Sequence, residues 1–410
     1  MMGSHFKCRS CEADNGSLVI DLGLQPLANN LLRPEDSPEA EPKFPLRIAV
    51  CEKCWLIQIL ETVPPVKLFS EYLYFSSFSQ NMLNHAKTAA QSYLSDFELG
   101  RQSLVIEVAS NDGYLLQNFV HFGVPCLGIE PAANIAKVAR EKGIETLTEF
   151  FGFELAERLA NEGHSADLIL GNNVFAHVPD TNGFVASVKK LLKSQGSAVF
   201  EFPYGVDLIE HNEFDTIYHE HVFYFTLTPL LPLFARHGLE LWRVERIPIH
   251  GGSLRLFVAH AGSRPVENSV VRLAQEERDK GLTDLRYYAD FGKRVERLRY
   301  DLRSLIQRLK REGKSIAAYG ASAKGSTLLN YYGIGHESLD FVADRSTYKQ
   351  GRLTPGTHIP IVPAEALLER MPDYTLLLTW NFADEILKQQ QAYRDRGGKF
   401  IIPIPEVKVV

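Results

Sequence analysis

The chain has 410 residues, of which 45% are hydrophobic and 23% are charged, and its formal net charge is -6. A single core stops growing well below this length, so two or three globular domains are expected. A weakly acidic chain has no basic field for a nucleic-acid backbone, which argues against nucleic acid as a partner. No apolar run is long enough to span a membrane and no secretory signal opens the chain, so we expect a cytoplasmic protein without a membrane partner.

Residues 6 to about 72 are rich in turns, because prolines interrupt each candidate helix. Two CxxC motifs lie in this stretch, each spaced so that a tight turn directs two thiolates at one ion. Four thiolates complete a closed tetrahedral Zn²⁺ site, which is structural rather than catalytic. The alternative, two unrelated pairs of buried or redox-active cysteines, would make the doubled spacing a coincidence. The predicted ligands are Cys8, Cys11, Cys51 and Cys54.

A second domain is predicted to begin near residue 73. Residues 79–97 have apolar side chains at helical spacing, and strand-like segments alternate with helical ones after them. This alternation is typical of βαβ units, which form a parallel sheet with helices on both faces. The expected strands are 104–108, 126–130, 167–173 and 197–203.

The turn after the first of these strands is where a doubly wound fold receives a nucleotide, but it lacks the GxGxxG pattern. Glu107 would repel a pyrophosphate there, whereas it suits the ammonium and sulfonium groups of S-adenosylmethionine. Glu130 lies at the end of the second strand, where a carboxylate can accept hydrogen bonds from both ribose hydroxyls. Each of these residues alone could be an ordinary turn or cap residue, but their order favours S-adenosylmethionine. The predicted cofactor-binding residues are Glu107, Ser110, Asn111, Asp112, Gly113, Glu130, Pro131 and Asn172.

The segment FDTIYHEHVFYF, residues 214–225, places four polar side chains between apolar flanks. A metal site made by His219, Glu220 and His221 is one alternative, although the i, i+4 spacing of HExxH is absent, and a structural polar loop is another. Proton transfer is a third task for the cluster. A histidine side chain suits proton transfer near neutral pH, Glu220 could orient that histidine or pair with its charge, and the Tyr218 hydroxyl could hydrogen-bond a developing oxyanion.

A charged amphipathic helix is predicted at about 270–312, and a further strand, turn and helix begins at 315–325. With the strand-like segments that follow, the C-terminal third is expected to form another doubly wound unit. Lys324 lies where a helix N-terminus and an ammonium group together make an anion site suited to a diphosphate. Arg345 is a further candidate for contacts to phosphate or base. The predicted substrate-binding residues are Ser322, Lys324, Lys349 and Arg352.

From Cys8 to nearly the C-terminus, the chain resembles the S-adenosylmethionine-dependent sugar C-methyltransferases of deoxysugar biosynthesis, the NDP-4-keto-6-deoxyhexose 3-C-methyltransferases. The resemblance rests on the paired CxxC, VIEVASNDGYLL, GIEPAANIA, NNVFAHVPD, FDTIYHEHVFYF, HGGSLR, YGASAKGSTLLN and RLTPGTHIP. It implies three domains, with zinc in the first, S-adenosylmethionine in the second and the nucleotide-sugar between the second and third. It also implies that Tyr218, Glu220 and His221 occupy catalytic positions and that His177 and Tyr72 lie near the substrate.

The sequence therefore predicts an α/β protein with a zinc-binding domain at 1–72, a central Rossmann-like class I methyltransferase domain at 73–262 and a second Rossmann-like α/β domain at 263–410. The expected reaction is methylation of C-3 of an NDP-4-keto-6-deoxysugar through an enolate, and a monomer is one state the chain could adopt. An O- or N-methyltransferase acting on another small metabolite is an alternative that leaves the Tyr-His-Glu-His cluster without a clear task. A zinc-containing binding or scaffold protein is another, which leaves the polar crevice residues without one.

Overall fold

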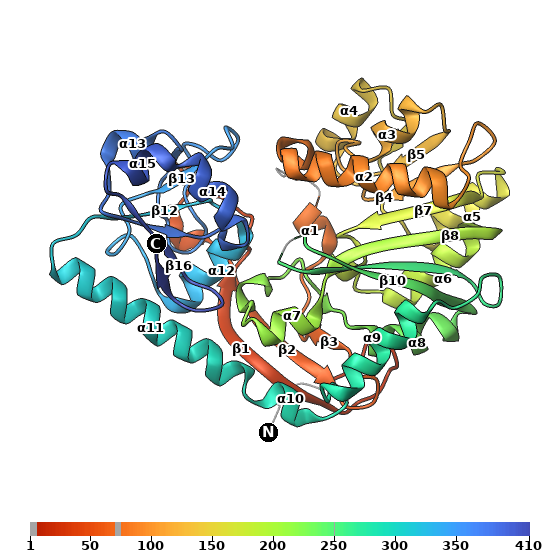
Figure 1. The fold of residues 1–410 in the computed structure, drawn as a ribbon, viewed down its shortest axis with the longest axis horizontal. Coiled ribbons are helices and arrows are strands. Elements are labelled where there is room, and N and C mark those ends of the chain that lie inside the picture. The colour runs from red at the N-terminus through yellow and green to blue at the C-terminus, as the bar shows by residue number, and fades with distance from the viewer. Residues whose placement is uncertain (1–5, 70–74, 250) are drawn as a thin grey trace.

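The computed structural model describes residues 6–69, 75–249 and 251–410, whose strands form three sheets (Figure 1). One sheet belongs mainly to the N-terminal segment, one to the central segment and one to the C-terminal segment. The predicted α/β class, with a Rossmann-like sheet in both the central and the C-terminal segments, is confirmed. Among the described residues, no helix is both long and apolar enough to cross a membrane.

The N-terminal sheet has four antiparallel strands in the order β1-β2-β3-β9. One cysteine pair lies in a turn before β1 and the other in the turn between β2 and β3, and a short helix, α1, ends the module. The fourth strand comes from far along the chain, so this sheet is closed by a segment of the central region. The bounds are β1 Gly16–Pro26, β2 Lys43–Cys51, β3 Ile57–Ile59, α1 Pro65–Phe69 and β9 Phe223–Tyr224.

The central sheet has seven strands in the order β10-β11-β8-β7-β4-β5-β6. Strands β4 to β8 are parallel, and β11 runs antiparallel to both β8 and β10. The chain leaves β4 toward β5 and β6 and then returns to β7 on the other side, which makes the end of β4 a topological switch point. The bounds are β4 Val105–Val108, β5 Cys126–Ile129, β6 Thr146–Leu147, β7 Ala166–Asn172, β8 Leu192–Pro203, β10 Leu239–Ile247 and β11 Ser253–His260.

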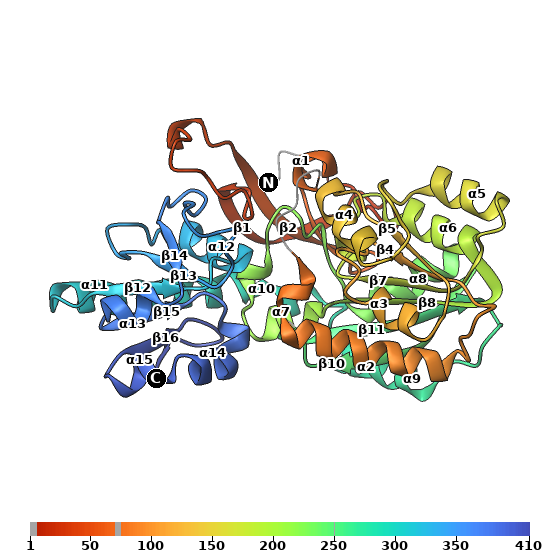
Figure 2. The ribbon, with the colours of Figure 1, turned by 90° about the horizontal axis from the view of Figure 1, so that it is seen from above.

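Helices cover both faces of the central sheet (Figures 1 and 2). The predicted helix at 79–97 is present as α2, whose first turn is capped because the Ser79 side chain accepts a hydrogen bond from the amide of Met82. Its buried face includes Ala86, Ala90 and Tyr93, which pack against the sheet. The bounds are α2 Gln80–Asp96, α3 Leu116–His121, α4 Ala133–Glu141, α5 Phe153–Asn161, α6 Thr181–Leu191, α7 Gly205–Glu210, α8 Leu227–Arg236 and α9 Asn268–Asp279.

The C-terminal sheet has the order β14-β13-β12-β15-β16-β17, and its first five strands are parallel. Its switch point lies between β12 and β15, so α12 begins at the edge that faces the central unit (Figure 1). The bounds are β12 Ile316–Tyr319, α12 Ala323–Tyr332, β13 Val342–Asp344, β14 Ile361–Pro363, α13 Ala366–Arg370, β15 Tyr374–Leu377, α14 Ala383–Gln389, α15 Gln391–Asp395, β16 Lys399–Ile402 and β17 Lys408–Val409.

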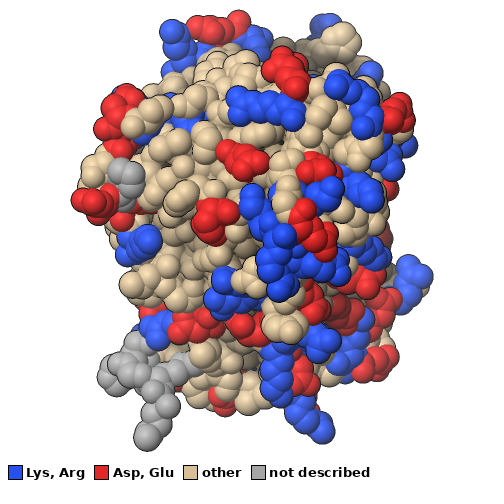
Figure 3. All heavy atoms as spheres, turned by 90° about the vertical axis from the view of Figure 1, so that its left-hand side faces the viewer, with Lys and Arg blue, Asp and Glu red and all other residues tan. Residues whose placement is uncertain are grey.

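The helical stretch expected at about 270–312 is interrupted. It forms α9, α10 (Leu285–Ala289) and α11 (Phe291–Arg311), because the backbone turns at Gly281, which has φ of +81°. The long α11 packs against β1 and against the C-terminal unit, where the Tyr332 hydroxyl donates to the carbonyl of Val295. Several exposed acidic and basic side chains of α11 form i, i+3 or i, i+4 ion pairs. Acidic and basic side chains are interspersed over this side of the molecule (Figure 3). This pattern fits a solvated linking helix.

Candidate active site

A cavity of about 510 Å³ lies at the carboxyl ends of the central parallel strands and extends to the C-terminal unit. Its size is in the range of small-ligand pockets, and it lies beside the switch point of the central sheet. All three segments contribute to its wall: Asn29 from the N-terminal module, Glu130 and His221 from the central segment, and Lys324 and Asn381 from the C-terminal unit.

Glu130 and Asn172 are the parts of the central wall that best fit a polar ligand. The Glu130 carboxylate accepts hydrogen bonds of 2.9 Å from the amides of Asn111 and Ala132, and burial raises its pKa against the effect of those bonds. Each oxygen keeps a further lone pair for a ligand hydroxyl. Both side-chain amide atoms of Asn172 are buried without a hydrogen-bond partner among the described residues. Since an unmet buried amide is costly, Asn172 fits a site that a polar ligand completes.

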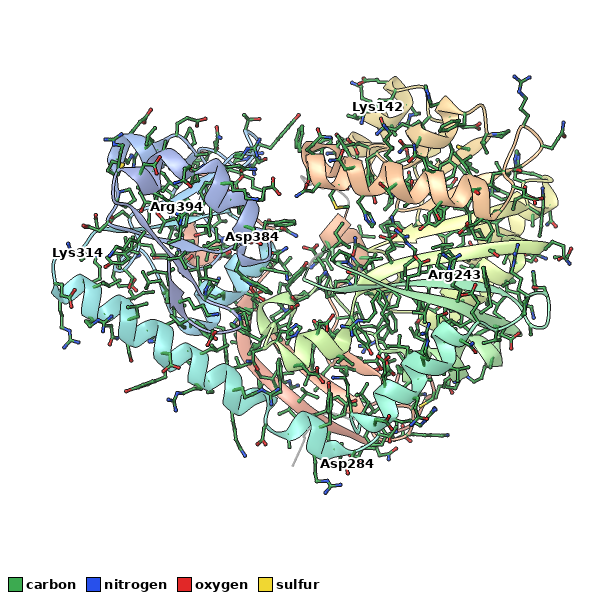
Figure 4. All side chains as sticks on the ribbon, in the orientation of Figure 1. Lys142, Arg243, Asp284, Lys314, Asp384 and Arg394 are labelled. Atoms are coloured by element: carbon green, nitrogen blue, oxygen red, sulfur yellow. The ribbon has the colours of Figure 1, made fainter. Side chains whose placement is uncertain are left out.

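Four of the predicted cofactor residues do not line the cavity but shape the turn behind it. Glu107 is 1% exposed, and burial, with Glu130 nearby, raises its pKa well above the usual range. Asp112 binds Lys142 (labelled in Figure 4) at 2.9 Å and the Ser77 hydroxyl.

The other two residues behind the wall fill close-packed positions. The Ser110 hydroxyl lies against Gly128, where an added Cβ would approach it to 2.5 Å. Gly113 has φ of +76°, and an added Cβ would lie 2.2 Å from Ile144 Cδ1. The turn therefore requires glycine at 113 for its backbone and its packing. The predicted cofactor residues that do line the cavity are Asn111, Glu130, Pro131 and Asn172.

His221 is held in a defined tautomer. Its Nδ1 lies 2.8 Å from the carbonyl oxygen of Thr216, and because a carbonyl only accepts, Nδ1 carries the proton. In the neutral ring, Nε2 is then the basic nitrogen. The ring centroid lies 4.0 Å from that of Tyr218 and 4.9 Å from that of His177, so these three side chains meet on one part of the cavity wall.

The remaining members of the polar segment point in different directions. Glu220 lines the cavity, is 4% exposed and accepts a 2.7 Å hydrogen bond from the Asn29 side chain. His219 turns away from it, with Nε2 3.2 Å from the carbonyl oxygen of Pro45. The described residues bring no metal-binding group of three or more side chains together here. His177 lines the cavity, and burial lowers its pKa to about 4, which makes it a weaker proton acceptor than an ordinary histidine. Tyr72 lies outside the described residues.

Lys324 presents a buried ammonium group to the C-terminal side of the cavity. It follows Ser322, whose hydroxyl caps α12 by accepting from the amide of Gly325. Lys324 Nζ has no hydrogen-bond partner among the described residues and lies 4.7 Å from the centre of the Trp380 ring. An ammonium group at a helix N-terminus, buried and without a hydrogen bond, fits an anionic ligand.

Two acidic residues lie behind this ammonium group. Asp215 accepts a 2.7 Å hydrogen bond from Trp380 Nε1. Glu213 is 3% exposed, and burial raises its pKa to about 7; Lys324 opposes the rise, and Asp215 adds to it. Burial also raises the pKa of Asp215, with Lys324 again opposing the rise, and neither carboxyl group lines the cavity.

The other predicted substrate residues are divided between the cavity and its surroundings. Ser322 and Lys349 line it, and Lys349 Nζ donates to the carbonyl oxygen of Ala321 at 2.8 Å. Arg352 does not line the cavity, and its Nη1 instead donates to the carbonyl oxygen of Leu31 at 3.4 Å. Arg345 interacts with Gln389 on the surface.

The four cysteines form a second site in the N-terminal module. Their sulfur atoms all lie within 4.8 Å of one another, with Cys8 and Cys54 at 3.5 Å and Cys11 and Cys51 at 3.6 Å. A tetrahedral Zn²⁺ with bonds of about 2.3 Å separates sulfurs by about 3.8 Å, so the arrangement fits the ion. Both turns have the same form, since the amides of Glu12 and Trp55 bond to the carbonyls of Cys8 and Cys51 at 2.9 Å.

Sequence reasoning missed several residues on the cavity wall. Asn29 and Asn381 bring side-chain amides from the two outer segments, and Phe150, Phe151 and Met82 provide apolar surface. These residues carry no local sequence signal for the site. Asn173 was not missed: the sequence places it with Asn172 at the end of a strand, where both were expected to line the crevice, and it does line the cavity, with φ of +54°.

Family models match all three segments. Residues 8–69 match a zinc binding domain, residues 82–244 a methyltransferase domain and residues 248–405 a C-methyltransferase C-terminal domain. The chain is also 38% identical over 405 residues to C-methyltransferase NovU of Streptomyces niveus, covering 98% of this chain and 96% of NovU. The chain belongs to this C-methyltransferase family. The predicted family is confirmed to that extent, as is a zinc-binding module at the N-terminus.

Two further proteins match part of the length of this C-methyltransferase. The ubiquinone biosynthesis O-methyltransferase of Bartonella quintana is 31% identical over 93 residues, or 22% of this chain and 38% of that protein. The crystal structure of magnesium protoporphyrin IX methyltransferase from Synechocystis PCC 6803 with bound SAM covers 44% of this chain and 79% of its own, at 12% identity and a TM-score of 0.34.

Proposed function

We propose that this C-methyltransferase uses S-adenosylmethionine to methylate C-3 of an NDP-4-keto-6-deoxysugar. The observation that supports it best is the position of His221. Its Nδ1 proton is donated to the carbonyl of Thr216, and its ring lies beside Tyr218 on the cavity wall. The same cavity is also lined by Lys324. Carbon methylation needs both a base and a way to hold the anionic substrate. The groups that would meet both requirements line one cavity.

The binding roles follow from the chemistry of each wall. Glu130 would accept hydrogen bonds from the ribose of the cofactor. The side-chain amide of Asn172, which has no hydrogen-bond partner among the described residues, would hydrogen-bond the same ligand. Bound S-adenosylmethionine supplies an electrophilic methyl group. Lys324, with the amides at the start of α12, would bind the diphosphate of the nucleotide-sugar, and Lys349 lies near enough to the same wall to assist.

The proton chemistry is assigned to the polar segment. His221 Nε2 removes the proton from the carbon beside the ketone, and the electrons of that C–H bond form the enolate, whose oxygen takes the negative charge. The Tyr218 hydroxyl donates to that oxygen, and Glu220 orients the cluster. The enolate carbon then forms the new C–CH₃ bond and the ketone re-forms, while the CH₃–S bond of the cofactor breaks, its electrons go to sulfur, and S-adenosylhomocysteine is the leaving group. Product release returns His221 to the neutral form by loss of its proton to solvent.

The proposal is tested by incubating the protein with S-adenosylmethionine and a panel of nucleotide 4-keto-sugars, and reading product masses. We expect one added methyl group, located on C-3 by NMR. The matched control is the same nucleotide-sugar with a 4-hydroxyl in place of the ketone, which has no acidified C–H bond and should give no product. Methylation of the hydroxyl compound, or a methyl group on oxygen or nitrogen, would contradict the proposal.

A further inference from the structure

The segment that carries Tyr218, Glu220 and His221 belongs to the sheet of the zinc module. The amide of Ile59, at the end of β3, donates to the carbonyl of Val222 at 2.8 Å, and β3 then pairs with β9. On the other side, His219 is tied to the carbonyl of Pro45 in β2. The segment is therefore held between the N-terminal module and the central segment, to which the amide of Val222 donates at the carbonyl of Ala176 (2.8 Å).

The cysteine turns are joined directly to β3, the strand that pairs with β9. Arg9 lies inside the first CxxC and donates to the carbonyls of Ile59 and Leu60, at 2.6 and 3.2 Å. The second CxxC ends at Cys54, just before β3 begins at Ile57. Any loss of order in the cysteine turns is thus transmitted to the strand that holds the polar segment.

Asn29 extends this support to a side chain in the cavity. It lies beyond the end of β1, and its Nδ2 donates to Glu220 Oε1 at 2.7 Å across a sequence separation of 191 residues. Its loop is anchored in turn by an antiparallel bridge between Leu32 and Leu353, with hydrogen bonds of 3.1 and 2.8 Å. Asn29 is therefore held at the point where the N-terminal module, the polar segment and the C-terminal unit meet.

We propose that Asn29 is a positioning residue, through which the zinc module fixes the Glu220 carboxylate for the catalytic segment. The hydrogen bond from the Asn29 side chain fixes the direction in which the Glu220 carboxyl group points. Glu220 is almost fully buried, so solvent cannot replace that donor at low cost. The role rests on the proposed function, since it acts through the carboxylate that serves the proton transfer.

The test is a double-mutant cycle on turnover with Asn29→Ala, Glu220→Ala and the double variant. We expect Asn29→Ala alone to lower kcat by about tenfold, while KM changes little and S-adenosylmethionine binds as before, and to have almost no further effect once Glu220 is alanine. Asn29→Asp keeps the shape but replaces the donor with an acceptor, so it should be at least as slow as Asn29→Ala. The exposed neighbour gives the matched control, Asn30→Ala, which should leave kcat unchanged.

Two outcomes would overturn the proposal. One is a loss of kcat from Asn29→Ala that is equally large in the Glu220→Ala background, and the other is an Asn29→Asp variant with wild-type kcat, which would show that only shape matters. The same four proteins are also compared by melting temperature, which needs no turnover. If the wild type gives no product with any keto-sugar, the proposed function fails, and non-additive melting shifts would still show that Asn29 fixes Glu220. Additive melting shifts would show that Asn29 and Glu220 do not interact, which would overturn the proposal as well.

Discussion

The Glu130 carboxylate accepts hydrogen bonds from two backbone amides, so its orientation is fixed before a ligand binds. If it holds the cofactor ribose, Glu130→Ala should weaken S-adenosylmethionine binding by about 1.5 to 3 kcal/mol, the usual contribution of hydrogen bonds to a charged group. The affinity for the nucleotide-sugar should not change. Calorimetry measures both, with Glu141→Ala, at the exposed end of α4, as the control. Unchanged cofactor affinity in the Glu130 variant would exclude the role.

Glu213 gives a pH dependence of stability whose sign is determined by its environment. Its pKa in the folded protein is raised from 4.5 to about 7, chiefly by burial. The stability that protonated Glu213 contributes is therefore present below about pH 4.5 and lost as the pH rises through 7.

Glu213→Gln, which stays neutral, should match the wild type near pH 4.5 and exceed it above pH 7 by at most about 3 kcal/mol. Unfolding by denaturant at several pH values measures the difference, and groups common to both proteins cancel. A constant difference across this pH range would show that Glu213 keeps its ordinary pKa.

The local sequence predicted some cavity residues well and others not at all. Glu130 and Asn172 follow strands, and parallel strands bring their carboxyl ends to one edge, so their place on the wall could be predicted. Asp112 lies in the turn after β4, but its side chain binds Lys142 instead of lining the cavity. No local sequence pattern reveals that contact. Asn29 could not be found from the sequence, because its partner is 191 residues away.

Among the elements, the two cysteine turns give the most direct prediction. The protein should purify with about one zinc ion per chain, because four preplaced thiolates bind Zn²⁺ tightly. Cys51→Ser should lose the metal and lower the melting temperature, whereas Cys126→Ser, which changes the one cysteine outside the cluster, should do neither. Metal analysis and native thiol alkylation are the measurements. Absence of metal, with all four thiols freely alkylated, would rule the site out.

The central strands β4, β5, β7 and β8 could be predicted, because each contains a short apolar segment between turns. The remaining central strands β6, β10 and β11 were not predicted. β9 could not be predicted, since a strand of two residues has no periodicity, and the polar segment before it resembled a loop. Its pairing with β3 is what places the polar segment on the N-terminal sheet. The break between α9 and α11 was also missed, because apolar spacing on either side of Gly281 continues in register.

For the whole molecule, the arrangement of the three units accounts for a cavity that no single unit could form. The hairpin of β1 and β2 reaches the C-terminal unit, where Glu41 accepts hydrogen bonds from the amide of Gly356 and from His358 (Figure 2). Across the cleft, the rings of Phe75 and Tyr348 stack with centroids 5.4 Å apart. These contacts join the C-terminal unit, which brings Lys324 to the cavity, to the other two segments that line it. The cytoplasmic location and the monomeric state stay predictions.

The most direct test of the proposed chemistry follows solvent deuterium exchange at the sugar carbon beside the ketone, without S-adenosylmethionine. The wild type should exchange that hydrogen, because the base acts before the methyl group is transferred. His221→Asn, whose side chain can still donate to the carbonyl of Thr216, should exchange about 10²- to 10⁴-fold more slowly, whereas His177→Asn should keep most of the rate. Exchange at the wild-type rate in the His221 variant would contradict the account.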